Sequence, residues 1–360
     1  MTTPLHIGFI PLVDAAALII AVDKGFAAAD EQQDGQHAQR VAAEGLDVTL
    51  VREVSWSNVR DKLNIGLFDA AHLLAPVAIA SSLGLGHVKV PIVAPFNLGL
   101  NGNAITVSPA LHAAIMGEIE GDAVDPMATA LALARVVAIR RKSGAEPLTF
   151  GMTFPFSTHN YQLRFWMAAG GVDPDEDVRL VVLPPPYMVD SLANGHVDAF
   201  CVGAPWNSVA VDLGVGHILH FVSDILVRAA EKVLAVRQSW SEKNADVLAA
   251  LVRAASHAAE YIEDPGNRAE TAHVLARPDR IGVGAEGSAQ ELRLVRADGH
   301  EDRIAPDVVA QGETTAERFF LEWRGAADPN HGKALDTYWI CTCEHGLNAS
   351  TFVARITAST

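Results

Sequence analysis

Four polar residues open a predicted helix in the stretch "GMTFPFSTHNYQLRFW", residues 151–166. They are Ser157, Thr158, His159 and Asn160, and they follow a strand-like run that ends in Phe-Pro-Phe. A serine near a histidine suggests nucleophilic catalysis. Residues two apart at a helix start do not face each other, however, and the sequence lacks a Gly-x-Ser-x-Gly turn. The spacing therefore disfavours a catalytic pair.

The same residues suit an anion site. Ser157 or Thr158 is a favourable N-cap. The first N–H groups of a helix have no intrahelical partner, and the helix dipole adds partial positive charge there. His159 can add a hydrogen-bond donor. A plain helix cap with an exposed histidine fits this spacing too, so both interpretations stay open. We expect the aromatic run from Tyr161 to Trp166 to anchor the helix in a core.

Three other stretches place donors at the ends of predicted strands. Trp56 offers an indole N–H beside Ser55 or Ser57, either of which can cap a helix. The turn at 101–103 (Asn-Gly-Asn) presents amides, and a Pro-Trp-Asn run at 205–207 follows a buried strand. In doubly wound folds ligands bind beyond the carboxyl ends of strands. The four stretches together predict a site for a small planar oxyanion, walled by aromatic rings.

Other ligand classes find little support. The sequence has no Walker A motif or glycine-rich phosphate loop, so a nucleotide is not the expected ligand. Of the three cysteines, Cys341 and Cys343 lie in "CTCEH", whose spacing matches no zinc pattern. We therefore expect no metal and no cofactor.

Composition narrows the class of protein. The 360 residues are 49% hydrophobic and 19% charged, as in a globular chain of two or three domains or one two-lobed fold. No run approaches the roughly 18 apolar residues of a membrane span, so we expect no membrane partner. The net charge is 27 − 43 = −16. Because a negative surface repels phosphates, direct binding of RNA or DNA is not expected.

Strand-like runs alternate with helical patterns, which predicts an α/β protein with mostly parallel sheets and helices on both faces. The helical patterns include Trp56–Ile65, Pro186–Ala193 and the amphipathic run 244–263. Segments 29–45 and 279–313 are polar or lack a period and are expected to be long solvated loops, with a partner surface as the alternative. The predicted strands are Leu5–Ile10, Val48–Val54, Ala70–Ala75, Val90–Phe96, Ala104–Val107, Thr149–Thr153, Val178–Leu183, Val197–Val202, Ile218–Val222 and Val233–Arg237.

Two stretches resemble each other. Residues 64–80 and 194–210 share Gly-x-x-Asp-Ala followed by proline. In each, a helix ends at a glycine turn, and Asp69 or Asp198 opens a buried strand. We expect both carboxylates to bond backbone groups at the strand entry. The repetition indicates two lobes built on one plan.

The chain resembles a known family over about residues 5–207, and more weakly over 231–263. The stretches that carry the resemblance are "GFIPLVDAAALIIAVDKG", "VSWSNVRDKLNIGLFDAAHLLAP", "GMTFPFSTHNYQLRFWMAAGGVDP" and "DAFCVGAPWN". They look like the nitrate- and bicarbonate-binding proteins of ABC transporters. They also look like the soluble NasS-type nitrate/nitrite sensors.

This resemblance implies a type II periplasmic-binding-protein fold, in which two α/β lobes close over a ligand cleft. We expect one lobe to comprise residues 1–97 and 223–360, and the other residues 98–222. By motif position, the ligand-contacting tryptophan and histidine fall on Trp56 and His159. A ligand-contacting amide falls on Asn103, where transporter members often have glutamine. The expected ligand-binding residues are Trp56, Asn103, Ser157, Thr158, His159, Pro205 and Trp206.

One departure from the family concerns charge. Ala204 stands where transporter members can carry a charged residue, which leaves His159 with more of the binding. The departure also argues against a metal-assisted bicarbonate site. The expected ligand is therefore nitrate or nitrite.

The N-terminus bears on the role. No lysine or arginine precedes Lys24, and Pro11 and Asp14 interrupt the apolar run, so we expect no secretory signal and a cytoplasmic protein. By resemblance, a cytoplasmic member is a sensor that holds a NasT-type RNA-binding antiterminator and releases it when nitrate or nitrite binds. The acidic surface suits a partner with a basic face. The alternatives are a transport binding protein and an enzyme of the same fold. For an enzyme, the sequence offers no convincing nucleophile, acid–base pair or metal cluster.

Overall fold

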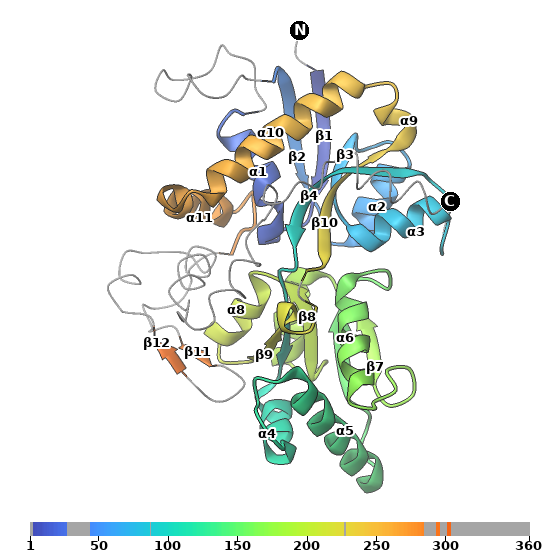
Figure 1. The fold of residues 1–360 in the computed structure, drawn as a ribbon, viewed down its shortest axis with the longest axis vertical. Helices are drawn as coiled ribbons and strands as arrows, with labels where there is room; N and C mark the ends of the chain where they lie inside the picture. Colours follow the sequence, from blue (N-terminus) through green and yellow to red (C-terminus); the bar gives the residue numbers. More distant parts are fainter. Residues whose placement is uncertain are drawn as a thin grey trace. The chain divides into compact units, whose positions relative to one another are not determined.

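The computed structural model describes residues 3–26, 44–86, 88–226, 228–283, 293–295 and 301–303. These residues form two compact units. Unit 1 comprises the described residues of 1–100 and 230–284, and unit 2 comprises the described residues of 101–229 and 285–337 (Figure 1). The chain passes between units at 100/101 and 229/230, whereas the expected crossings were 97/98 and 222/223. The predicted loops at 29–45 and 279–313 lie largely outside the described residues, and "CTCEH" lies wholly outside them.

Unit 1 is built on a five-stranded sheet of order β2-β1-β3-β10-β4. Strands β1 and β2 and strands β1 and β3 pair in parallel, whereas β10 is antiparallel to both of its neighbours. The strands are β1 (Thr3–Phe9), β2 (Leu46–Arg52), β3 (Ala70–Leu74), β4 (Ile92–Leu100) and β10 (Ala230–Arg237). The helices are η1 (Val13–Ala15), α1 (Ala16–Asp23), α2 (Trp56–Asn64), α3 (Ala75–Leu83), α9 (Gln238–Ser241), α10 (Ala245–Glu263), η5 (Pro265–Asn267) and α11 (Arg268–Ala276).

Unit 2 repeats this arrangement with the order β7-β6-β8-β5-β9. Strand β6 is parallel to β7 and β8, and β5 is antiparallel to β8 and β9. The strands are β5 (Asn103–Val107), β6 (Thr149–Met152), β7 (Arg179–Val182), β8 (Ala199–Gly203) and β9 (His217–Phe221). The helices are α4 (Pro109–Glu118), α5 (Pro126–Ser143), α6 (Thr158–Ala169), η3 (Pro185–Tyr187), α7 (Met188–Ala193), α8 (Trp206–Asp212) and η4 (Val222–Asp224). A two-stranded sheet pairs β11 (Arg293–Val295) with β12 (Glu301–Arg303).

All of the predicted strands are present, but three expectations need correction. Both sheets are mixed rather than mostly parallel. Strand β10 begins at Ala230 instead of Val233. The predicted strand started too late because charged residues are usually exposed, whereas Glu231 and Lys232 are fully buried within the strand. The helix expected over 186–193 is a 3-10 turn followed by a short α-helix.

The predicted repeat is confirmed by equivalent bonds in the two units. Asp69 Oδ2 accepts a hydrogen bond from His6 N at 2.9 Å, and Asp198 Oδ2 accepts one from Thr149 N at 2.8 Å. The backbone N–H of each aspartate donates in turn to the carbonyl oxygen of the same residue, at 2.9 and 2.8 Å. Each aspartate thus fastens the start of one parallel strand to its neighbour.

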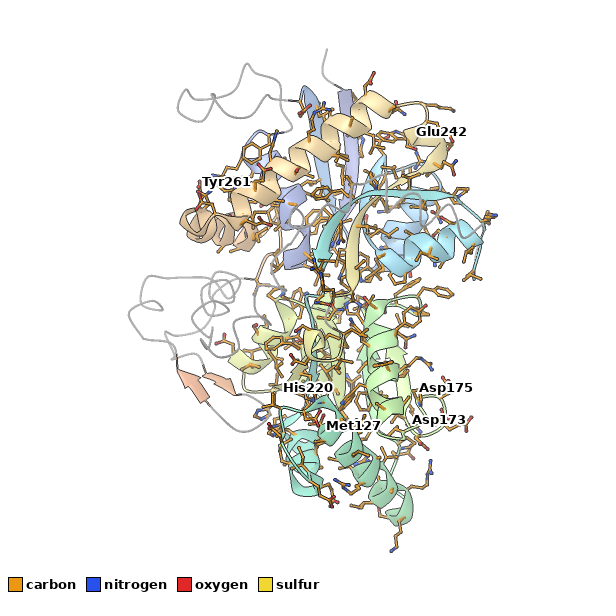
Figure 2. The ribbon with its side chains drawn as sticks, in the orientation of Figure 1. Met127, Asp173, Asp175, His220, Glu242 and Tyr261 are labelled. Carbon is orange, nitrogen blue, oxygen red and sulfur yellow. The ribbon has the colours of Figure 1, made fainter. Side chains whose placement is uncertain are left out.

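Helix α6 is held against α5 by contacts near its C-terminal end. Trp166 is 1% exposed, its Nε1 donates to Pro126 O at 3.0 Å, and its ring lies edge-on to that of His220, labelled in Figure 2. Tyr161 and Phe165, by contrast, are 45% and 58% exposed. The expectation that the whole aromatic run anchors the helix is therefore wrong. Of the aromatic residues in the run, only Trp166 lies on the helix face that meets the core.

The close approach of α6 to α5 predicts a stability effect at Gly170. A Cβ atom there would lie 2.2 Å from Ala130 O, so Gly170→Ala must push the two helices apart. We expect Gly170→Ala to lower the free energy of unfolding by about 1–3 kcal/mol in urea denaturation. Gly117 of α4 has nothing within 4 Å of its Cβ position, and Gly117→Ala should raise stability by roughly 0.5–1 kcal/mol. Equal effects of the two substitutions would contradict this packing.

Candidate functional site

The topology of unit 2 brings three of the four predicted stretches to one edge of its sheet. Strands β6 and β8 are parallel, so both end there. Strand β5 runs the opposite way and begins there, because its first residue, Asn103, pairs with Gly203 at the end of β8. Helices α6 and α8 follow β6 and β8 (Figure 1). Asn103, the start of α6, Pro205 and Trp206 therefore gather at this edge, as the sequence predicts for unit 2.

Ser157 caps α6, because its Oγ accepts a hydrogen bond from Asn160 N at 3.1 Å. His159 is fully buried, so the interpretation as an exposed histidine is wrong. Its Nδ1 lies 3.1 Å from Thr153 Oγ1. If the hydroxyl donates to Nδ1, the ring hydrogen of neutral His159 is on Nε2, which is then a donor. The serine and the histidine thus have separate structural partners.

Several buried polar atoms around this edge have no hydrogen-bond partner within the described part of the chain. They are Thr158 Oγ1, Gln162 Nε2, Trp206 Nε1 and Asn103 Oδ1. Buried polar atoms are paired in the great majority of cases, so an unpaired group is a candidate ligand contact. Sequence reasoning missed Gln162, although its place four residues after Thr158 puts both on one helix face.

The start of α8 is fixed by Asn207, which had no assigned role among the expected binding residues. Thr106 Oγ1 donates to Asn207 Oδ1 at 2.7 Å, and Asn207 Nδ2 donates to Val202 O at 2.8 Å. Pro205 has no N–H and lies at the N-cap of α8, so it positions Trp206 rather than donating a bond. Ala204 N donates to Gly102 O at 3.2 Å, which ties β8 to the turn before β5.

Unit 1 places Trp56 at the start of α2, where Ser55 accepts from Asn58 N at 3.3 Å, confirming the predicted cap. Trp56 is 1% exposed, and its Nε1 has no partner among the described residues. The ring centroid lies 5.2 Å from that of His72 and 5.5 Å from Lys232 Nζ. Trp56 is therefore part of a buried polar cluster and packs against a cation.

The cation belongs to a group of buried charges that the sequence analysis did not find. Lys232 Nζ lies 2.8 Å from Asp14 Oδ2 and 2.9 Å from Glu231 Oε1. His72 Nε2 lies 2.9 Å from Asp14 Oδ1, and Ile10 N donates to His72 Nδ1. The only sign of this cluster in the sequence was the pair Glu231-Lys232, just before the predicted strand Val233–Arg237.

The charges in this cluster shift one another's pKa. Burial opposes ionisation of Asp14, but Lys232 and His72 outweigh it and hold the pKa of that carboxyl well below its usual value of 3.8. Burial also opposes the charge of Lys232, yet Asp14 and Glu231 raise the pKa of its ammonium. Burial lowers the pKa of His72. The cluster therefore holds a charged lysine and a charged aspartate in the interior of unit 1.

Other parts of the described chain offer weaker candidates for a ligand site. A cavity of about 380 Å³ between α4 and α5 lies near Leu148 and Asp198, which precede β6 and β8, and so at the opposite edge of the sheet. Within the described ranges, no three histidine, cysteine, aspartate or glutamate side chains are grouped to hold a metal ion. No helix in those ranges is long and apolar enough to cross a membrane.

Comparison with known proteins identifies the family. The model of the NMT1-like family matches residues 1–276, and the chain belongs to that family. A model of the citrate synthase C-terminal domain matches residues 221–360, a minority of the chain.

Several relatives carry names that refer to anions. The chain is 36% identical to the nitrate import ATP-binding protein NrtC of Synechocystis, covering 78% of this chain and 38% of that protein. It is 32% identical to the nitrate/nitrite binding protein NrtA of Nostoc, covering 79% and 59%. It is 35% identical to the bicarbonate transport ATP-binding protein CmpC of Synechococcus elongatus, covering 76% and 37%. The chain thus spans less than two thirds of each of these relatives.

A solved structure confirms the predicted fold class. The crystal structure of the periplasmic nitrate-binding protein NrtA from Synechocystis matches with a TM-score of 0.70 at 23% identity, over 98% of this chain and 89% of that one. At this identity the match shows the fold, a two-lobed α/β architecture of the periplasmic-binding-protein kind.

The buried cluster of unit 1 predicts a pH-dependent stability. Asp14→Asn should lower the free energy of unfolding at pH 7 by roughly 2–4 kcal/mol, because Lys232 loses a buried partner. Since folding lowers the pKa of Asp14, its contribution is complete above about pH 3.8 and is lost as the pH falls below that value. The difference between wild type and variant should therefore shrink in acid.

Urea denaturation at pH 7, 4 and 3 measures this difference. Asp175→Asn is the matched control, because Asp175 is an exposed carboxylate paired with Arg164 (Figure 2). It should change stability much less than Asp14→Asn. A difference for Asp14→Asn that does not depend on pH would contradict the proposed charge of Asp14.

Proposed function

We propose that this chain binds a small planar oxyanion, nitrate or nitrite, at the edge of the unit 2 sheet where α6 begins. The observation that carries the proposal is the set of buried donors at that edge of the sheet. Thr158 Oγ1, Gln162 Nε2 and Trp206 Nε1 have no partner in the described chain. The first N–H groups of α6 add to them, since Ser157 caps only Asn160 N.

A planar oxyanion suits such a donor set. Its negative charge is shared among oxygens that accept hydrogen bonds in different directions, and bonds to an ionised acceptor are stronger than neutral ones. Burial strengthens each bond further by lowering the local dielectric. These short-range donors must act against the overall charge of −16, which repels anions at longer range.

Most of the unpaired atoms are donors, which suits nitrate and nitrite. Nitrate and nitrite only accept hydrogen bonds, whereas bicarbonate also carries an O–H that needs an acceptor. The unpaired atoms at the site include two nitrogen donors and one hydroxyl, against one amide oxygen, Asn103 Oδ1. The names of the relatives, which mention nitrate, nitrite and bicarbonate, support this class of ligand.

We further propose that the protein is a cytoplasmic sensor, which holds a NasT-type antiterminator and releases it on binding nitrate or nitrite. This role requires that the ligand bind one conformation better than another, by a free energy that the partner also senses. The net charge of −16 supports a partner with a basic face. The second candidate is a binding protein of an anion transporter, which the relatives named for nitrate import and bicarbonate transport favour.

Nitrate and nitrite should stabilise the protein against heat, whereas chloride at the same concentration should not. A ligand at 100 times its Kd adds about 2.7 kcal/mol to the free energy of unfolding.

His159→Gln should weaken the affinity for nitrate about 10- to 100-fold in calorimetry, because it removes a buried ring that lies beside the helix start. His196→Ala, at an exposed position of unit 2, is the control and should bind as wild type. No response to millimolar nitrate, nitrite or bicarbonate would refute the binding function.

The two roles differ in location and partner. If the protein is a sensor, native protein recovered from the cytoplasm should carry the small RNA-binding antiterminator, and millimolar nitrate should release it. Chloride should leave that complex intact. Recovery of the native protein from the periplasm, with binding to a permease and its ATPase, would instead establish the transport role and overturn the sensor proposal.

A further inference from the structure

Asn103 and Gln162 form a buried pair of amides in unit 2. Asn103 Nδ2 donates to Gln162 Oε1 at 3.0 Å, and both side chains are 0% exposed. The bond joins β5 to α6, two elements that are far apart in the sequence. Since this buried hydrogen bond is lost if either amide turns over alone, the pair fixes the orientation of the two side chains relative to each other.

The pair leaves Gln162 with a donor to spare. Its carbonyl oxygen is engaged by Asn103, whereas its Nε2 has no partner among the described residues. In the structure the NH2 group of Gln162 is directed away from Asn103, because Asn103 donates to the Gln162 oxygen. Turning the Gln162 amide alone by 180° would bring its NH2 group against the NH2 group of Asn103, so the direction can reverse only if both amides turn together.

The position of Gln162 brings this donor to the start of α6. Gln162 lies four residues after Thr158 and three after His159, and residues at these spacings are neighbours on a helix surface. Asn103 begins β5 opposite Gly203, at the edge where α6 and α8 also begin. The spare donor of Gln162 therefore lies on the same face of α6 as Thr158 Oγ1 and at the same edge of the sheet as Trp206 Nε1.

We infer that Gln162 is the amide that contacts the oxyanion, and that Asn103 is a positioning residue that orients it. The inference rests on the proposed function, since the oxyanion is its ligand, and it changes the expectation that Asn103 makes the contact. It also gives Gln162 a part in specificity. An oriented NH2 group favours ligands that accept a hydrogen bond and disfavours those that must donate one at this place.

A double-mutant cycle tests the two roles, with nitrate affinity measured by calorimetry. Gln162→Met keeps the length of the side chain and removes the donor, and should weaken binding about 10- to 100-fold. Asn103→Leu keeps the volume and removes only the orienting bond, and should weaken binding roughly three- to tenfold. Because Asn103 acts through Gln162, the double variant should match Gln162→Met within about twofold.

Two further variants guard against trivial outcomes. Gln162→Glu is isosteric and replaces the donor by a carboxylate oxygen, so it should weaken nitrate binding at least as much as Gln162→Met. Gln238→Met is the control, because Gln238 is an exposed glutamine of unit 1, and it should bind as wild type. Thermal unfolding without ligand identifies any variant that fails to fold. If Gln162→Met fails to fold, the nitrate affinity of Gln162→Glu decides whether the donor at position 162 contacts the anion.

The outcomes separate this inference from the proposed function. Additive losses at the two positions, or a larger loss for Asn103→Leu than for Gln162→Met, would show that Asn103 contacts the anion and would overturn the inference. Wild-type affinity in Gln162→Glu would overturn it too. If the wild type itself binds none of nitrate, nitrite and bicarbonate, the proposed function fails, and the inference fails with it.

Discussion

One antiparallel strand in each sheet determines where the polar groups meet. Because β5 runs against β8, its first residue, Asn103, lies beside the end of β8 and the helix starts that follow β6 and β8. Strand β10 does the same in unit 1, where Lys232 pairs with Leu74 at the end of β3. A wholly parallel sheet would place these two side chains at the other edge. The fastening of the parallel strands by Asp69 and Asp198 keeps this registry in both units.

The two units solve the burial of polar groups in different ways. Unit 1 buries formal charges and pairs them, with Lys232 between Asp14 and Glu231. Unit 2 gathers neutral donors at its sheet edge, including Gln162 and Trp206. Removing one partner of a buried ion pair leaves an uncompensated charge, whereas a neutral donor without a partner costs only about 1–3 kcal/mol. A site that must exist both with and without an anion is therefore less costly to build from neutral donors.

Local chemistry was readable in the sequence, and long-range pairing was not. The caps Ser55 and Ser157 were predictable because a cap depends on residues three apart. The orientation of the Gln162 side chain depends on its hydrogen bond to Asn103, which lies 59 positions away in the sequence. Lys232 reads as a solvated residue until β10 is placed between β3 and β4. The prediction for the aromatic run was wrong for a related reason. Which of its rings is buried depends on the helix face that packs against α5, and this face includes Trp166 but not the exposed Phe165.

Thr153 and Asn103 orient polar side chains at the proposed anion site. Each occupies one end of a buried polar side chain, Thr153 at Nδ1 of His159 and Asn103 at Oε1 of Gln162. In the structure the other end of the Gln162 side chain is therefore a donor, its NH2 group. Orientation of this kind is set during folding, and binding does not have to supply it. For the proposed anion site such advance orientation matters, because the long-range field of a chain of charge −16 opposes the binding of an anion.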